Sequence, residues 1–184
     1  MKPNVDLIND FLAQNEAEML FEVLKKGIEW KQEKIKIFGK EVAEPRLVAW
    51  YGDKAYKYSG KFMQPQPWTK ELLEIKSIIE ENTGYKFNSV LLNYYRNGLD
   101  SMGWHSDDEA ELGKNPVIAS LSLGQERKFQ FRFKADKSIK VQYLLSSGSL
   151  LLMKNDCQHL WQHQVPKSGI QVGERINLTF RLIV

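Results

Sequence analysis

The chain has 184 residues, 42% of them hydrophobic and 27% charged, which predicts one globular domain, residues 1–184, with a substantial core. Its net charge of +3 does not indicate any class of partner. Its first residues lack a signal-peptide pattern, and no apolar run approaches the roughly 20 residues that cross a bilayer. A single cysteine, Cys157, excludes an internal disulfide, so we expect a protein of the reducing cytoplasm without a membrane partner.

The N-terminal third combines a predicted helix with a basic segment. Apolar residues recur at helical spacing from about residue 15 to residue 26, which predicts an amphipathic helix. The segment 25–61 then holds ten basic and five acidic residues, a net charge of +5, whereas the rest of the chain is slightly acidic. This asymmetry favours a local contact with a polyanion. The alternative is a lysine-rich hairpin that is merely solvated.

A basic hairpin is predicted around Phe38 and Gly39. Three lysines flank the apolar residues of this tip, namely Lys34, Lys36 and Lys40. Lysines at such a tip would contact phosphates, and the aromatic ring would stack or wedge between bases. The alternative is an ordinary hairpin whose Phe38 packs on the core.

The remaining predicted elements are one helix and a series of strands. A helix is expected from about Trp68 to Asn82, since Pro67 precedes it and Gly84 can end it. After Gly84 the period changes to two, which predicts strands at 87–95, 117–123, 128–134, 140–145, 148–153 and 175–183. Helices followed by strands predict an α+β, mostly β fold. Specifically, we expect a double-stranded β-helix (jelly-roll) with helices packed on one side.

Three residues form a candidate metal site. In extended backbone His105 and Asp107 project to the same side, so both can reach one ion. The third ligand is His163 or His159, and His163 is preferred because it lies in an extended segment just before Pro166. Two imidazoles and a carboxylate are the facial triad of non-heme Fe(II) oxygenases. The rival ion is zinc in a hydrolytic site, which gives no reason for the arginines described next.

The C-terminal strand carries a candidate binding face for a dicarboxylate. Polar residues alternate there with apolar ones and share one face, namely Arg175, Asn177, Thr179 and Arg181. Arginine matches a carboxylate in bidentate fashion, so two arginines suit the two ends of an oxo-diacid. Asn93 and Tyr95 are also two apart and would face the same pocket, with Tyr94 pointing the other way into packing. The alternative is an edge strand with its polar face in water.

Together these motifs resemble, in order, the signature of the AlkB family, Fe(II)- and 2-oxoglutarate-dependent dioxygenases that repair alkylated nucleobases. The resemblance covers residues 38–183 and is closer to the eukaryotic nuclear DNA-repair homologues than to the founding bacterial enzyme. It rests on the segments 93–95, 105–109, 163–166 and 175–181, with further counterparts at 38–40, 51–53 and 58–60. A division follows into helices plus a nucleotide-recognition lid, about 1–86, and a jelly-roll catalytic core, about 87–184.

The resemblance also implies a role for each residue of the site. It assigns the iron to His105, Asp107 and His163. It assigns 2-oxoglutarate to Asn93, Tyr95, Arg175, Thr179 and Arg181, with Asn177 close by. It assigns the nucleic acid to Phe38, Gly39, Lys40, Tyr56, Lys57, Tyr58, Asp108 and Glu109. In this scheme Phe38 fills the gap left by a flipped base, Tyr58 stacks on the target, and Asp108 and Glu109 contact it.

The implied function is oxidative demethylation of N-alkylated bases such as 1-methyladenine and 3-methylcytosine in DNA. The reaction consumes O2, decarboxylates 2-oxoglutarate and releases formaldehyde. We expect a monomer, located in the nucleus if the source is a eukaryote. An RNA demethylase or another 2-oxoglutarate-dependent hydroxylase is the alternative enzyme. A nucleic-acid-binding module without catalysis is the remote alternative, although such a module has no use for the metal set.

Overall fold

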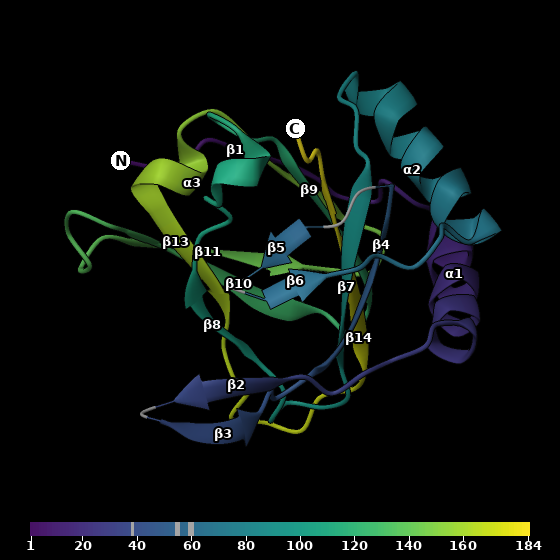
Figure 1. The fold of residues 1–184 in the computed structure, drawn as a ribbon, viewed down its shortest axis with the longest axis horizontal. Helices are drawn as coiled ribbons and strands as arrows, with labels where there is room; N and C mark the ends of the chain where they lie inside the picture. The colour runs from purple at the N-terminus through teal and green to yellow at the C-terminus, as the bar shows by residue number, and fades with distance from the viewer. Residues whose placement is uncertain (38, 54–55, 59–60) are drawn as a thin grey trace.

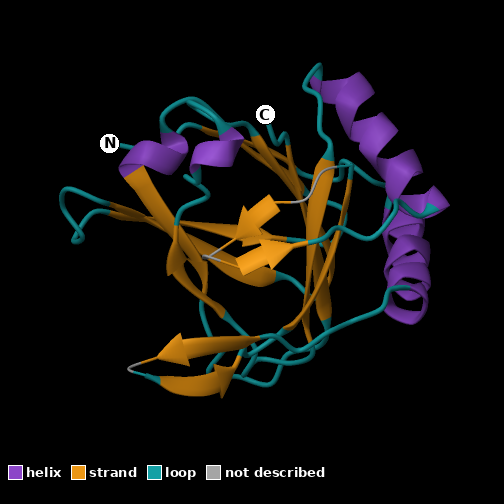
Figure 2. Ribbon diagram, viewed as in Figure 1, coloured by secondary structure: helices purple, strands orange, loops and turns teal. Residues whose placement is uncertain are grey.

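The structure is a computed structural model that describes residues 1–37, 39–53, 56–58 and 61–184, apart from the side chains of 36–37, 56–58 and 61–63. Two antiparallel sheets face each other, and the longer helices lie outside one of them (Figures 1 and 2). This is the double-stranded β-helix that the sequence predicts. None of the helices in the described part has the length and apolarity that a bilayer crossing requires.

The larger sheet has six strands in the order β1-β12-β9-β14-β7-β4. Their bounds are β1 Val5–Ile8, β4 Leu47–Gly52, β7 Ser89–Tyr95, β9 Ile118–Gly124, β12 Leu150–Met153 and β14 Arg175–Arg181. Strands β1 and β4 at its two ends come from the first 86 residues. Neither was predicted, because β1 is short and β4 is buried on both faces and so lacks a clear alternation.

The smaller sheet has four strands in the order β11-β10-β13-β8. Their bounds are β8 Met102–His105, β10 Arg127–Phe133, β11 Lys140–Leu145 and β13 Trp161–Val165. Two hairpins lie apart from both sheets, one of β2 Lys34–Ile37 and β3 Lys40–Ala43, the other of β5 Tyr56–Tyr58 and β6 Lys61–Met63. The first confirms the predicted basic hairpin, with Gly39 at a φ of 78° in its turn.

Helices α1 Gln14–Gly27 and α2 Lys70–Thr83 confirm the two predicted helices. Helix α2 begins two residues later than expected because Thr69 caps it, its hydroxyl accepting from the Leu72 N–H at 3.3 Å. Gly84 ends it in the left-handed region with a φ of 76°, as predicted. The short helices η1 Ala110–Leu112 and α3 Cys157–Leu160 were not predicted.

Side chains alternate between the two faces of the larger sheet and form two separate clusters of the hydrophobic core. One face of β7 and β14 packs against α1 and α2 through residues such as Leu92, Ile176 and Leu178. The opposite face looks toward the smaller sheet, which contributes Phe129 and Phe131. Polar side chains on this second face are therefore enclosed between the sheets.

Strand β14 differs from the edge strand that was weighed as an alternative. It pairs with β9 on one side and β7 on the other, at the centre of the larger sheet, and all its residues are buried. The edge-strand interpretation is therefore wrong. The predicted strand 175–183 ends earlier, at Arg181, and Leu182 beyond it is exposed.

Candidate metal and co-substrate site

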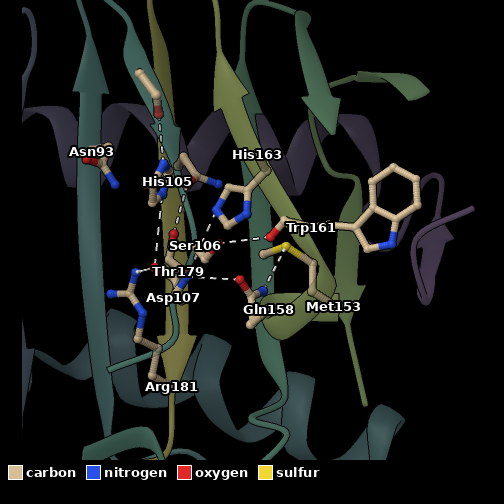
Figure 3. Close-up of polar contacts among 12 residues, drawn as sticks. Asn93, His105, Ser106, Asp107, Met153, Gln158, Trp161, His163, Thr179 and Arg181 are labelled. Carbon is tan, nitrogen blue, oxygen red and sulfur yellow. Dashed lines mark hydrogen bonds and ion pairs between the residues drawn. The ribbon is translucent and has the colours of Figure 1, made fainter. Parts of the chain in front are cut away.

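The structure brings His105, Asp107 and His163 together between the sheets (Figure 3). His105 ends β8 and is the direct cross-strand partner of His163 in β13. His105 Nε2 lies 4.0 Å from Asp107 Oδ1, and His163 Nε2 lies 4.0 Å from Asp107 Oδ2. One donor atom from each residue falls within 4.8 Å of the other two, which is the spacing of ligands around a single ion.

The protonation states of the three residues suit a cation. Burial, with His105 beside it, lowers the pKa of His163 to about 3, and burial also lowers the pKa of His105. Burial alone would raise the pKa of Asp107, but Arg181 and the imidazoles outweigh it and hold this pKa at about 2. Two neutral imidazoles therefore face one carboxylate at neutral pH, and this donor set fits a divalent metal.

Each imidazole is also oriented. His105 Nδ1 lies 2.9 Å from the Gly103 carbonyl, so Nδ1 carries the proton and Nε2 keeps its lone pair toward the site. The His163 ring stacks on Phe129 with centroids 5.2 Å apart and an interplanar angle of 21°. Its Nδ1 is buried and has no hydrogen-bond partner among the described residues.

A cavity opens beside the three residues. Its lining joins apolar residues of both sheets to polar groups on β7 and β14. The polar residues of the lining outside the triad are Asn93, Tyr95, Ser120, Asn177, Thr179 and Arg181. Five of the six predicted co-substrate residues thus border one enclosed space. As expected, Tyr94 points the other way into the core beneath the helices.

Arg175, the sixth of these residues, does not line this cavity. It is 1% exposed, its Nη2 donates to Ser122 Oγ at 3.0 Å, and its guanidinium lies 5.3 Å from the centre of the Tyr95 ring. Burial lowers the pKa of Arg175 to about 10, so the group remains a cation. Its Nε and Nη1 are buried without a hydrogen-bond partner in the described part of the chain. A buried guanidinium with donors to spare fits a carboxylate, because such a cation is costly unless it is paired.

Two residues that contact the site were not predicted from the sequence, namely Arg46 and Gln158. Arg46 is buried, donates from Nε to Asn93 Oδ1 at 2.9 Å and pairs with Glu44 at 2.8 Å. Gln158 is fully buried, and its Oε1 accepts the Asp107 N–H at 2.9 Å. Neither belongs to a metal, carboxylate or alternating pattern. Only the fold reveals that they contact site residues.

Only some of the residues expected to contact nucleic acid have side chains that the structure describes. Lys40 is exposed in β3, while Phe38 lies outside the described residues. Tyr56, Lys57 and Tyr58 form β5, and their side chains also lie outside the description. The Asp108 carboxylate pairs with Lys134 Nζ at 2.9 Å, and Glu109 is half-buried.

Three other residues near His163 do not line the cavity. His159 is exposed, and its Nε2 accepts the Asn115 N–H at 3.3 Å. Cys157 and Trp161 are buried in the core between the sheets. Burial raises the pKa of the Cys157 thiol to about 12, so this group is an inert packing residue.

The sequence matches one family model and is similar to known proteins. Residues 4–181 match the family model described as "2OG-Fe(II) oxygenase superfamily". The chain is 44% identical over 188 residues to "Alpha-ketoglutarate-dependent dioxygenase alkB homolog 3" of Bos taurus, covering 97% of this chain and 66% of that protein. It is 37% identical over 181 residues to "DNA oxidative demethylase ALKBH2" of Homo sapiens, covering 92% of this chain and 69% of that protein.

A solved structure agrees with these matches at the level of the fold. The structure titled "The structure of OsALKBH1" superposes with a TM-score of 0.69 and 18% identity, covering 98% of this chain and 99% of that one. The chain spans slightly less than two thirds of the length of the homolog 3 proteins from Bos taurus and Rattus norvegicus, 66% and 64%.

Proposed function

The chain belongs to the AlkB family within the 2OG-Fe(II) oxygenase superfamily, and we propose that it demethylates N-alkylated bases of nucleic acid oxidatively, with 2-oxoglutarate and O2 as co-substrates. One observation carries the proposal. Two neutral imidazoles and an ionised carboxylate converge at a cavity that Arg181 also lines, and the buried cation Arg175 lies in the same strand. The similarity to an alpha-ketoglutarate-dependent dioxygenase and to a DNA oxidative demethylase supports the same reaction class.

In this proposal His105, Asp107 and His163 hold Fe(II). The bound ion supplies the redox chemistry that activates O2 for oxidation of an N-alkyl carbon, with decarboxylation of 2-oxoglutarate. The lowered pKa values keep both imidazoles neutral, so that each ring has a nitrogen lone pair for the metal. It keeps the carboxylate ionised through Arg181, whose Nη2 donates to Asp107 Oδ1 at 2.8 Å.

We assign 2-oxoglutarate to the polar face of β7 and β14. Arg175 offers two unpartnered donors to one carboxylate, while Asn93, Tyr95 and Thr179 border the cavity with groups able to hydrogen-bond. Asn177 serves these neighbours indirectly, since its amide nitrogen donates to Ser120 Oγ at 2.8 Å and its oxygen accepts from Thr179 at 3.0 Å. The packed strands fix these groups before the co-substrate arrives, which reduces the ordering cost of binding.

Alkylated DNA is the proposed substrate, with RNA as the alternative. The hairpin β2–β3 extends from the body of the protein and carries Lys34 and the exposed Lys40 (Figure 1). We propose that Lys40 and Gly39 contact the backbone, that Phe38 fills the gap left by the flipped base, and that the β5–β6 hairpin holds the nucleotide.

Lesion selectivity would come from charge and from pairing. Bases such as 1-methyladenine and 3-methylcytosine are cationic, so the carboxylates of Asp108 and Glu109 favour them. A base whose pairing is already blocked also costs less to extrude, by about a few kcal/mol. We further propose that the chain acts as a monomer, in the cytoplasm or, in a eukaryote, the nucleus. In this proposal about residues 1–86 hold the helices and the lid and also add β1 and β4 to the larger sheet, while about 87–184 form the rest of the catalytic core.

The experiment is an assay of formaldehyde release and 2-oxoglutarate decarboxylation with Fe(II), with and without methylated DNA and RNA oligonucleotides. Decarboxylation that depends on methylated DNA supports the proposal, and preference for RNA selects the alternative enzyme. Decarboxylation indifferent to nucleic acid points to another substrate, and none at all points to a binding module. His105→Ala should abolish turnover without unfolding the chain.

A further inference from the structure

The backbone of Asp107 lies beyond the ladder that holds His105. Pairing of β8 with β13 ends at the His105–His163 pair, and residues 106–109 belong to no strand. Asp107 is nevertheless 1% exposed, so its N–H is buried and needs an acceptor. Of the three residues proposed to hold the metal, it is the one that no strand positions.

Gln158 of α3 supplies that acceptor. Its Oε1 accepts the Asp107 N–H at 2.9 Å, and its Nε2 lies 3.4 Å from the Met153 sulfur (Figure 3). Gln158 is 0% exposed, and both Met153, which its Nε2 contacts, and the preceding residue Cys157 belong to the core between the sheets. An apolar side chain of the same size would fill this space without burying an amide. The hydrogen bond to Asp107 is what compensates the burial of the Gln158 amide oxygen.

Lys134 strengthens the same connection. Its Nζ donates to the Gln158 carbonyl at 2.8 Å and to Asp108 Oδ2 at 2.9 Å, so one ammonium joins α3 to the residue after Asp107. On the other side, Ser106 Oγ donates to the Trp161 carbonyl at 2.9 Å. The three consecutive residues 106–108 thus each contact either Lys134, directly after β10, or the segment 158–161.

We infer that Gln158 and Lys134 are positioning residues that hold the Asp107 carboxylate in place for the metal. The inference rests on the proposed function and adds to it two residues that do not touch the ion. Arg181 fixes one carboxylate oxygen from the side, while Gln158 and Lys134 fix the backbone that carries it. Partners of this kind around a metal ligand are worth about 10–100-fold in metal affinity.

The test is the affinity for Mn²⁺, which takes the same nitrogen and oxygen donors, measured by calorimetry without co-substrate or substrate. Gln158→Met removes the acceptor at nearly constant volume and should weaken Mn²⁺ binding about 10–100-fold. Lys134→Gln should weaken Mn²⁺ binding by a smaller factor. Lys134→Arg, which keeps the charge and the donors, should bind Mn²⁺ as tightly as the unmodified chain. In the metal-free protein, amide hydrogen exchange at Asp107 should be faster in Gln158→Met than in the unmodified chain.

Two controls separate positioning from stability. Gln164→Met removes a glutamine of β13 that binds Gln130 at 2.7 Å, away from the cavity, and should keep the Mn²⁺ affinity. Ile79→Ala destabilises the core under α2, remote from the site, and should also keep it. If Gln158→Met changes neither the Mn²⁺ affinity nor the amide hydrogen exchange at Asp107, the positioning role is overturned while the proposed function stands. Failure of the unmodified chain to bind Mn²⁺ would overturn the proposed function, and the positioning role with it. If Gln158→Met does not fold, the two Lys134 variants test the inference in its place. Weaker Mn²⁺ binding by Lys134→Gln but not by Lys134→Arg would support it, and unchanged binding by Lys134→Gln would overturn it.

Discussion

Arg181 Nη2 lies 2.8 Å from Asp107 Oδ1, with both side chains almost fully buried. The guanidinium therefore contacts the carboxylate of the metal triad while it also lines the cavity proposed for 2-oxoglutarate. We therefore expect this contact to couple the binding of the metal to the binding of the co-substrate, because Arg181 contacts Asp107 and also lines the cavity. The sequence pattern assigned Arg181 to the co-substrate alone.

Replacement of Arg181 should affect stability and metal binding together. Arg181→Met leaves a buried carboxylate without its cation, which costs roughly 3–5 kcal/mol in the free energy of unfolding of the metal-free protein. Added Mn²⁺ should recover part of this loss, since the ion supplies the missing positive charge. Denaturant unfolding with and without Mn²⁺ measures both effects. Arg132→Met, on the outer face of β10 against Trp104, is the matched control, and Mn²⁺ should stabilise it only as much as it stabilises the unmodified chain.

Arg175 should act on the co-substrate without acting on the metal. It contacts Ser122 and Tyr95 rather than the triad, so Arg175→Met should leave the Mn²⁺ affinity unchanged. The KM for 2-oxoglutarate should rise more than tenfold, because loss of a buried charged partner costs about 2–5 kcal/mol. Arg175→Lys should restore little, since a single ammonium lacks the planar fork. An unchanged KM in Arg175→Met would remove this residue from the co-substrate site.

The hairpin lysine Lys40 should contribute to nucleic-acid affinity through phosphate contact. Lys40→Gln should weaken binding of a methylated oligonucleotide similarly for all sequences and reduce the slope of log affinity against log salt by about 1. Binding titrations at several salt concentrations give this slope. Lys128→Gln, which removes an exposed lysine of β10, serves as the comparison, and equal slopes in the two variants would exclude the hairpin as a phosphate contact.

Glu80 at the end of α2 should make stability depend on pH. It accepts from the Phe87 N–H at 2.9 Å and pairs with Lys76 and Lys86, both at 3.1 Å. Burial alone would raise the pKa of Glu80, but these three partners outweigh it and lower that pKa. A lowered pKa in the folded state means that the stabilisation is complete above the unfolded value of about 4.3 and is lost as pH falls through the folded value.

Glu80→Gln should therefore lower the free energy of unfolding at pH 7 by roughly 1–3 kcal/mol. The difference from the unmodified chain should be smaller at pH 3, because below the unfolded pKa of about 4.3 the proton taken up by Glu80 in the unfolded state removes part of this stabilisation. Urea unfolding at the two pH values measures this. Glu81→Gln, at the exposed neighbouring position, should change stability little at either pH. A Glu80→Gln deficit that is equally large at pH 3 would contradict the pKa argument.

Elements with one strong period could be predicted from the sequence. The alternation around Phe129 and Phe131 predicted β10 closely, and the helical spacing with Pro67 and Gly84 predicted α2 within two residues. Strands β1, β4 and β8 were not predicted, because they are short or buried on both faces and carry no clear alternation. For such strands pairing partners decide the structure more than local pattern does.

The site was predictable to the extent that its residues form local motifs. His105 and Asp107 are two apart, and Arg175 and Arg181 share one strand face, so short-range geometry suffices for them. Arg46 and Gln158 act through contacts with residues far away in the sequence, at Asn93 and Asp107. Only the packing of β4 beside β7 and of α3 beside the end of β8 brings these contacts about, and no spacing rule encodes that.

The proposed metal and co-substrate site can be tested by anomalous diffraction at the iron edge, from crystals grown anaerobically with Fe(II) and 2-oxoglutarate. We predict one peak bonded to His105 Nε2, a carboxylate oxygen of Asp107 and His163 Nε2, with the diacid reaching Arg175 from the same cavity. Absence of a peak at these three side chains, or a diacid bound away from Arg175 and Arg181, would contradict it.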